Sequence, residues 1–367
     1  MKTPELLAPA GSLTMLNTAF DFGATAVYAG QPRYSLRVRN NDFGNIEVLR
    51  EGIETAHAQG KNFYLVSNIF PHGAKTRTYV KDMEPVIALK PDALIMSDPG
   101  LIMLVRENWP DMPIHLSVQA NTVNGHAAKF WRSVGVSRVI LSRELSLDEI
   151  EAVRQDCPEM EVEVFIHGAL CIAYSGRCLL SGYFNHRDPN QGTCTNSCRW
   201  DYKVAKADED ATGDIYLLEE GNRPGEWMPI EEDMHGTYIL NSKDLRAIEH
   251  VQRLTEMGVD SFKIEGRYKD LPYLKNATAH YRQLIDEILN DMPEFAKSSS
   301  GSCSFQVGKP ERPLWRSPAA SALAGRRSPR RRPRSPRQKP SRARNIIPSC
   351  SPNSAGWGPY CRPRPRR

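Results

Sequence analysis

From residue 5 to about residue 168, short apolar runs alternate with longer amphipathic stretches. The runs are continuously apolar, as expected for parallel strands whose two faces are both buried. A repeat of this kind predicts βα units around a parallel sheet. The seven strand candidates are Leu6–Ala8, Ala26–Ala29, Phe63–Asn68, Ala93–Met96, Ile114–Gln119, Arg138–Ser142 and Val162–His167.

Two further apolar runs, Tyr238–Leu240 and Phe262–Ile264, bring the total to nine for the eight strand places of a barrel. We assign Phe262–Ile264 as the closing strand and Tyr238–Leu240 to an insertion of about residues 169–240. The predicted fold is α/β, a TIM-like (β/α) barrel over residues 1–295 with a cysteine-rich insertion after the seventh strand. A doubly wound open sheet is the alternative, because periodicity does not show closure.

Helix signals support the same pattern. Ser146 precedes Leu147-Asp148-Glu149, which is typical of an N-cap followed by acidic residues in the first turn. Glycines at positions 60 and 258 follow two amphipathic stretches and predict helix ends. The predicted helices include Ile46–Gln59, Leu245–Met257 and Leu271–Leu289.

The net charge of +5 conceals a division of the chain. Residues 301–367 contain fifteen Arg and two Lys against Glu311, a net of +16, which leaves −11 for residues 1–300. An acidic folded part needs a local basic patch or a partner to bind RNA. The Arg-, Pro- and Ser-rich segment 296–367 is predicted to be a disordered tail. It is either an RNA-binding arm, with Arg326–Arg344 as its basic run, or a non-native end.

The N-terminal residues lack a basic region followed by an apolar one, and no apolar run approaches the roughly 20 residues of a membrane span. We therefore expect a cytoplasmic protein without a membrane segment. A reducing cytoplasm disfavours disulfides, so the crowding of four of the eight cysteines between 171 and 198 indicates a metal or cofactor. The other cysteines, Cys157, Cys303, Cys350 and Cys361, are interpreted as incidental.

The candidate metal ligands are Cys171, Cys178, Cys194 and Cys198. Four thiolates can complete one tetrahedral zinc site or one 4Fe-4S cluster. Structural zinc usually uses closely spaced ligand pairs, whereas only the last two cysteines here are close in sequence. This spacing favours an iron–sulfur cluster, with structural zinc and uncoordinated cysteines as alternatives.

Polar residues at the predicted strand ends are the other site candidates. Glu163 and His167 share one face of a strand by period two, which makes them the candidate catalytic pair. Each candidate also has an interpretation without a role in function. His167 would then be a buried histidine, and Glu265 and Arg267 would form an ion pair at the barrel rim. Arg267 could instead grip a substrate carboxylate. The candidate substrate-binding residues are Asn68, Gln119, Glu265 and Arg267, with Asn121 nearby.

Several common catalytic motifs are absent from the sequence: His-Glu-x-x-His, Gly-x-Ser-x-Gly, a P-loop and Gly-x-Gly-x-x-Gly. The sequence therefore argues against the common classes of hydrolase and nucleotide-binding protein. A cysteine-protease interpretation would use Cys171 or Cys178 with His167 as base. It does not explain the three further cysteines beside the nucleophile.

The run Glu163-x-Phe165-x-His167-Gly168-Ala169-x-Cys171, followed by Ser175-Gly176-x-Cys178, resembles the signature of the collagenase-like peptidases of unassigned catalytic type. The resemblance covers roughly residues 4–295. It extends to Glu5–Gly11, Asn241–Leu245 and Lys263–Arg267.

Within this family the chain resembles the RNA-hydroxylating branch. The resemblance implies a tRNA-modifying enzyme that forms 5-hydroxyuridine at the wobble uridine, with prephenate as a required co-substrate, a 4Fe-4S cluster on the four cysteines, and tRNA and an electron donor or modification partner protein as partners. Two other functions stay open: a collagenase-like peptidase and a non-enzymatic RNA-binding protein with a structural metal. The family continues with a small C-terminal domain, so the tail 296–367 is interpreted as a frameshifted or truncated end that replaces it.

Overall fold

The computed structural model describes residues 3–36, 41–171, 173–206, 216–230, 244–266 and 270–291. The chain divides into two units, Met1–Ser317 and Pro318–Arg367, and the second contains none of the described residues. The predicted tail 296–367 therefore lies outside the description. Among the described residues, no helix has both the length and the apolar character needed to cross a membrane.

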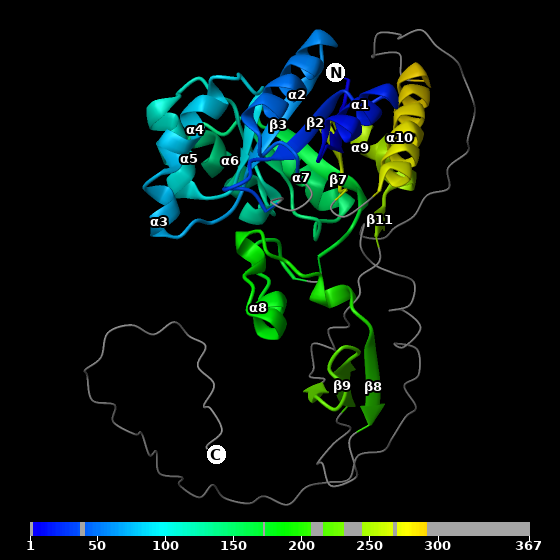
Figure 1. Cartoon of the computed structure of the whole chain (residues 1–367). Helices are drawn as coiled ribbons and strands as arrows, with labels where there is room; N and C mark the ends of the chain where they lie inside the picture. Colours follow the sequence, from blue (N-terminus) through cyan, green and yellow to red (C-terminus); the bar gives the residue numbers. More distant parts are fainter. Residues whose placement is uncertain are drawn as a thin grey trace, which may run out of the picture. The chain divides into compact units, whose positions relative to one another are not determined.

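Eight parallel strands form a closed barrel (Figure 1), as predicted. Each strand pairs with its neighbour in the chain from β1 to β7, and β12 pairs with both β7 and β1. The pairing of β6 with β7 completes the ring and rules out the open sheet. The strands are β1 Glu5–Pro9, β2 Ala26–Gly30, β3 Asn62–Ser67, β4 Ala93–Met96, β5 Ile114–Leu116, β6 Arg138–Ile140, β7 Glu161–Gly168 and β12 Ser261–Ile264.

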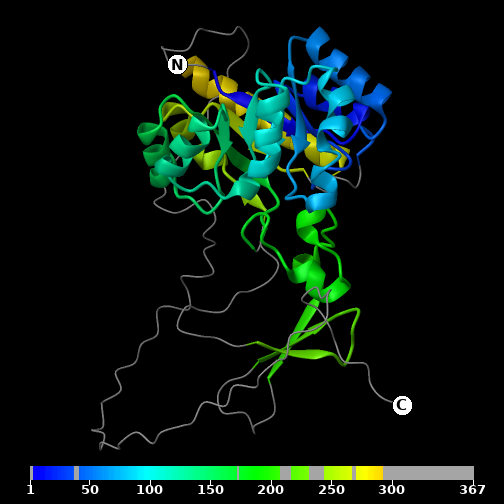
Figure 2. The same ribbon diagram turned by 90° about the vertical axis from the view of Figure 1, so that its left-hand side faces the viewer.

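Helices follow the strands and lie outside them in both ribbon views (Figures 1 and 2). The predicted cap at Ser146 is confirmed as a capping box, in which the Glu149 side chain and the Ser146 side chain each bond the other residue's backbone N–H. The helices of the barrel are α1 Leu13–Asp21, α2 Ile46–Ala58, α3 Gly73–Thr76, α4 Tyr79–Ile87, α5 Pro99–Asn108, α6 Gly125–Ser133, α7 Leu147–Asp156, α9 Val251–Glu256 and α10 Leu271–Asp291.

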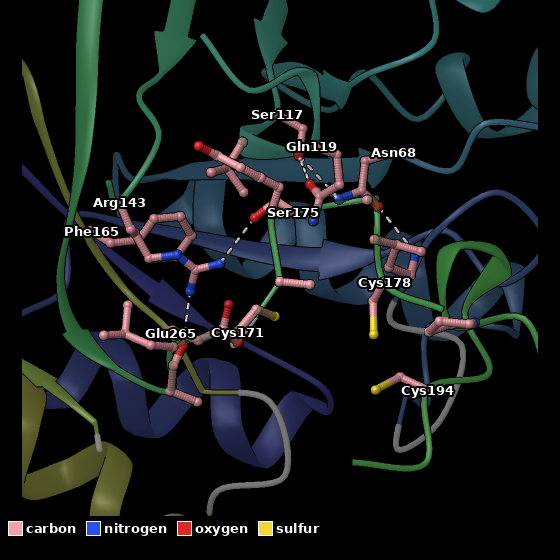
Figure 3. A pocket seen from close by; sticks show the side chains of 18 of the residues that line it. Asn68, Ser117, Gln119, Arg143, Phe165, Cys171, Ser175, Cys178, Cys194 and Glu265 are labelled. Carbon is pink, nitrogen blue, oxygen red and sulfur yellow. Dashed lines mark hydrogen bonds between the residues drawn. The ribbon is translucent and has the colours of Figure 1, made fainter. Parts of the chain in front are cut away.

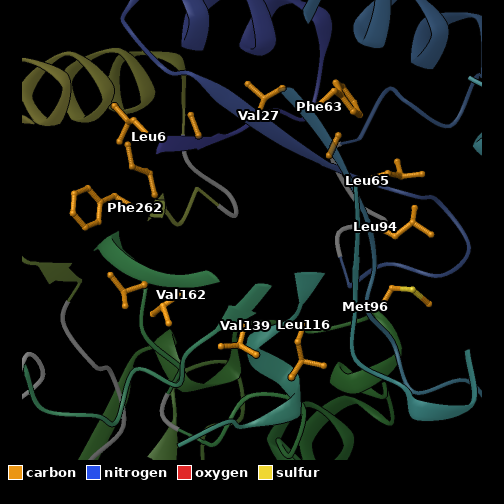
Figure 4. Packing of buried hydrophobic residues seen from close by; sticks show 14 of the residues in the cluster. Leu6, Val27, Phe63, Leu65, Leu94, Met96, Leu116, Val139, Val162 and Phe262 are labelled. Carbon is orange, nitrogen blue, oxygen red and sulfur yellow. The ribbon is translucent and has the colours of Figure 1, made fainter. Parts of the chain in front are cut away.

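Alternate residues of each strand enter two separate apolar clusters. One lies between strands and helices. It contains Leu6, Val27 and Leu94 of the strands (Figure 4) together with helix residues such as Leu16 and Leu101. The other lies inside the barrel and includes Leu7, Tyr28 and Ile95, the next residue along each strand. Full burial of such side chains stabilises the fold by about 1.5–3 kcal/mol each. The continuous apolar runs of the sequence are thus explained by burial on both faces.

The insertion after β7 contains α8 Leu180–Asn185 and an antiparallel sheet of β8 Tyr202–Lys206, β9 Tyr216–Glu220 and β10 Trp227–Ile230. The chain returns to the barrel at β11, Leu245–Arg246, which pairs antiparallel with the end of β7. The predicted run Tyr238–Leu240 lies outside the described residues.

Three predicted boundaries are wrong. The run Arg138–Ser142 is a strand only to Ile140. The run Ile114–Gln119 is a strand only to Leu116, because the chain turns into a 3-10 helix at Val118–Ala120. The predicted helix Leu245–Met257 is shorter, since its first residues form β11 and only Val251–Glu256 is α-helical. The predicted end at Gly258 is confirmed, and this glycine has a positive φ of 80°.

Candidate functional site

A cavity of about 240 Å³ opens where the strands of the barrel end (Figure 3). Its inner wall comes from the barrel interior, including Tyr28, Val66, Ile95 and Phe165, and its outer wall comes from the insertion. The carboxyl ends of barrel strands are where loops of different origin can meet around a ligand. The cavity therefore joins the barrel to the cysteine-rich segment.

All four candidate cysteines line this cavity, although up to 27 residues separate them in the sequence. Figure 3 shows the sulfur atoms of Cys178 and Cys194 turned toward one another. Burial raises the pKa of the Cys178 and Cys198 thiols, and the charges of the neighbouring cysteines raise it further. The thiols thus lie near enough to repel one another when ionised, which a bound metal centre would relieve.

No three His, Cys, Asp or Glu side chains in the described parts of the chain converge as ligands of a single metal ion. A 4Fe-4S cluster binds each thiolate on a different iron atom, so its cysteines stand around the cluster rather than around one point. All four cysteines line one cavity, which is the placement that a shared cluster requires. They are the residues that would hold such a cluster.

Hydrogen bonds fasten the cysteine segment to the barrel. Asn121, in a left-handed conformation after β5, donates from Nδ2 to the Ser175 carbonyl over 2.9 Å. Arg143 Nη1 donates to the Ala169 carbonyl over 2.8 Å, and Arg199 Nη2 donates to the Leu170 carbonyl over 3.1 Å. These bonds fix the backbone on both sides of Cys171 relative to the strand ends.

Asn68 and Gln119, both predicted to bind substrate, line the cavity and contact each other. Asn68 Nδ2 donates to Gln119 Oε1 over 3.0 Å and to Ser117 Oγ over 3.1 Å, and Ser117 Oγ also donates to Gln119 Oε1. Leu36 N in turn donates to Asn68 Oδ1 over 3.1 Å. The amides are therefore held in fixed orientations by a network in which Asn68 and Ser117 are buried and Gln119 is half-buried.

Glu163, one of the predicted catalytic residues, is completely buried inside the barrel. Its Oε1 accepts from Lys263 Nζ over 2.7 Å, and its Oε2 lies 3.3 Å from Arg138 Nη1. Lys263 lines the cavity and Glu163 does not. Glu163 therefore acts on the cavity by holding the Lys263 ammonium in place.

His167, the other predicted catalytic residue, contacts α10. Its Nδ1 lies 3.4 Å from Tyr281 Oη, and its ring centroid lies 5.3 Å from that of Tyr273. The pairing of β7 with β12 is irregular here, since Phe165 is opposite Lys263 but His167 is opposite Ile264. This bulge breaks the period-two alternation from which we placed His167 on the same face as Glu163 and Phe165. The catalytic roles of the two residues stay predictions.

Glu265 lines the cavity, as expected for a substrate-binding residue, and Arg267 lies outside the described residues. Burial raises the pKa of Tyr273, and the charges of Asp244 and Glu265 raise it further, so both carboxylates act on this hydroxyl. Asp244 forms an ion pair with Arg199, which lines the cavity.

Several polar residues of the cavity were missed in the sequence, among them Ser117, Arg143 and Lys263. Ser117 and Arg143 follow β5 and β6 by one and three residues, so the strand-end criterion that selected Asn68 would have found both. Lys263 is a charged residue within an otherwise apolar strand, which is itself a signal of a buried partner.

Comparison with known proteins gives a consistent result. The model of peptidase family U32 matches residues 11–306. The chain is 58% identical over 318 residues to tRNA hydroxylation protein P of Escherichia coli K12, covering 80% of this chain and 70% of that protein. It is 34% identical over 297 residues to the 23S rRNA 5-hydroxycytidine C2501 synthase of the same organism, covering 81% of this chain and 41% of that protein.

Among solved structures, the U32 peptidase Mk0906 is similar with a TM-score of 0.45 and 11% identity, over 72% of this chain and 94% of that one. The family match spans the barrel strands from β2 onward together with the cysteine segment. The chain therefore belongs to peptidase family U32.

Proposed function

We propose that this protein is a tRNA-modifying enzyme that forms 5-hydroxyuridine at the wobble uridine, with prephenate as a required co-substrate and a 4Fe-4S cluster on Cys171, Cys178, Cys194 and Cys198. The observation that carries the proposal is the gathering of the four cysteines on one cavity with the strand-end polar residues. Relatives named for tRNA hydroxylation and rRNA hydroxycytidine synthesis support RNA hydroxylation as the class of reaction.

The bound cluster would supply electron-transfer chemistry beside the cavity. The chain's own residues would position the reactants. Asn68, Gln119 and Glu265 offer fixed hydrogen-bonding groups, and Glu163 holds the Lys263 ammonium at the cavity wall. A metal centre lined by such groups fits a modifying enzyme better than a structural metal remote from any cavity.

We place the RNA contact of the acidic barrel on the first part of the insertion, where the sequence has a local excess of positive charge. Residues 169–206 contain five Arg and Lys against two Asp, a net of +3. Tyr174 and Tyr183 in this segment are 60% and 58% exposed. Exposed aromatic rings among cations are suited to stacking single-stranded bases and contacting their phosphates. This surface adjoins the cavity, because Tyr174 also lines it.

The test is to purify the full chain without oxygen and measure iron, sulfide and visible absorption, then incubate it with tRNA and prephenate. Nucleoside mass spectrometry reports 5-hydroxyuridine. We expect broad absorption near about 400 nm and modified tRNA. Both signals should be lost in Cys171→Ser, Cys178→Ser, Cys194→Ser and Cys198→Ser. Cys157→Ala is the matched control, because Cys157 is a free thiol buried at the end of α7, away from the cavity.

Unmodified tRNA with an intact cluster would contradict the proposal. Cleavage of gelatin that depends on Cys171 but not on Cys194 would indicate a peptidase. A colourless zinc protein that binds tRNA without changing it would indicate a binding protein with a structural metal.

A further inference from the structure

We propose that Arg143 is the carboxylate-binding residue of the cavity and that it holds a small organic acid there, with Lys263 and the Gln119 amide as secondary contacts. This inference deepens the proposed function and rests on it for the identity of the acid. The strand-end cation that the sequence suggested for this task was Arg267. The structure instead assigns the role to a residue that follows β6.

Arg143 is held in place before any ligand arrives. Its guanidinium lies over the Phe165 ring, with 4.6 Å between Cζ and the ring centroid. Nη1 donates to the Ala169 carbonyl over 2.8 Å, and Nη2 donates to Ser175 Oγ over 3.3 Å. Figure 3 shows the side chain between Phe165 and Ser175 at the cavity. A guanidinium has five N–H donors, so this fixed group keeps donors for a ligand.

Arg143 also differs from the other cations of the cavity in its charge balance. Lys263 is paired with Glu163 over 2.7 Å, and Arg199 is paired with Asp244 over 3.4 Å. The recorded acceptors of Arg143 are neutral oxygens, and no carboxylate within the described ranges forms an ion pair with it. A half-buried guanidinium without a counter-charge favours an anionic ligand.

The neighbouring polar groups are also donors. Gln119 Oε1 accepts from both Asn68 and Ser117, which leaves its Nε2 hydrogens for a ligand. Lys263 Nζ lies 5.6 Å from the centroid of the same Phe165 ring that supports Arg143, so its charge is near the same space. These donors come from β12 and from the segments after β5 and β6. Among the described residues that line the cavity, the one carboxylate is that of Glu265. An acceptor-rich ligand fits this arrangement.

The size and depth of the cavity favour a free acid over a phosphate of the RNA backbone. About 240 Å³ is below the range of drug-sized sites, and a cluster on the four cysteines would take part of it, so the space that remains suits only a small acid. Phe165, which lies under Arg143, is 5% exposed and belongs to the apolar cluster inside the barrel. A backbone phosphate would have to enter that interior, whereas a small acid can do so alone.

The experiment is a calorimetric titration of the cluster-loaded full chain with prephenate, without oxygen, for the wild type and Arg143→Met. Loss of a charge-assisted hydrogen-bonded pair should weaken binding by about 10- to 100-fold. Arg143→Lys keeps the charge but not the planar fork and should show an intermediate loss. Arg33→Met is the matched control. Arg33 also lies over a ring, that of Tyr34, but it is exposed and does not line the cavity, so prephenate affinity should be unchanged.

Iron content and circular dichroism are measured on every variant. If Arg143→Met loses its cluster, Arg143→Lys decides the question, and wild-type affinity in that variant overturns the proposal. Wild-type affinity in a cluster-loaded Arg143→Met does the same. Displacement of prephenate by inorganic phosphate with equal affinity would show a phosphate site and also overturn the assignment to a small acid.

The two proposals fail in different ways. If prephenate binds in an Arg143-dependent way but no 5-hydroxyuridine forms, the proposed function is refuted and the binding site at Arg143 is not. If Arg143→Met modifies tRNA normally with an unchanged KM for prephenate, the binding site at Arg143 is refuted and the proposed function is not.

Discussion

Arg138 offers the sharpest test of how the barrel interior is stabilised. Its side chain is 4% exposed and lies 2.7 Å from Glu5, 2.8 Å from Glu161 and 3.3 Å from Glu163. Burial alone would lower the pKa of this arginine, but the carboxylates of Glu5 and Glu163 raise it well above its usual value. The cation therefore stays charged and joins β1, β6 and β7 at the end of the barrel where these strands begin.

Arg138→Met should destabilise the protein by about 3 kcal/mol. Removal of one partner of a buried ion pair costs roughly 3–5 kcal/mol, because a charge stays buried without compensation. The lower end applies here, since Glu163 keeps Lys263 at 2.7 Å and the Glu161 side chain is 34% exposed and can be hydrated. Glu5 loses its nearest cation but keeps the Tyr64 hydroxyl at 2.6 Å.

Urea unfolding followed by circular dichroism measures this change. Arg132→Met is the matched control, because Arg132 is exposed on α6, and it should stay within about 0.5 kcal/mol of the wild type. Adding Glu5→Gln to Arg138→Met removes the unpaired charge and should recover part of the loss. A loss below about 1 kcal/mol in Arg138→Met, or no recovery in the double variant, would refute the reasoning.

Three further predictions concern a glycine, a cap and an exposed ring. Gly168→Ala should destabilise by at least about 2 kcal/mol, since φ is 108° and a Cβ would lie 2.2 Å from the Glu265 carbonyl oxygen. Gly60→Ala, with positive φ but open space, is its control in urea unfolding, and equal losses would count against the clash. Ser146→Ala should lose about 1 kcal/mol by removing the capping box, and an unchanged unfolding midpoint would contradict this. Tyr174→Ala should weaken tRNA binding by about 5- to 100-fold at unchanged iron content, and wild-type affinity in a filter-binding titration would exclude stacking on this ring.

The strands were predictable because burial on both faces requires a continuous apolar run, and such a run is visible in the sequence without knowing which strands pair. The same holds for Ser146, whose cap is a local interaction. The gathering of the cysteines at a strand-end cavity followed from their place after the seventh strand, although spacing alone left the choice of metal open.

Contacts between distant segments were not predictable. An example is the buried ion pairs of Arg138, Glu163 and Lys263, which come from three different strands. Their charges alone do not show which residues pair. The orientation of His167 depends on a bulge between β7 and β12, which a period-two pattern of one strand cannot reveal. A two-residue strand such as β11 carries too short a pattern to be separated from the helix after it.

The pairing of β11 with β7 has a consequence for how this barrel can vary. Leu245 lies opposite Gly168, so the excursion of the chain begins and ends at adjacent backbone positions of one antiparallel ladder. Such positions are about 5 Å apart, a gap that a hairpin turn can bridge. The whole cysteine-bearing segment is thus a cassette whose two chain junctions with the barrel lie side by side. Exchange of this cassette for a short turn, or for a segment with different chemistry, would leave the eight parallel strands and their covering helices in register.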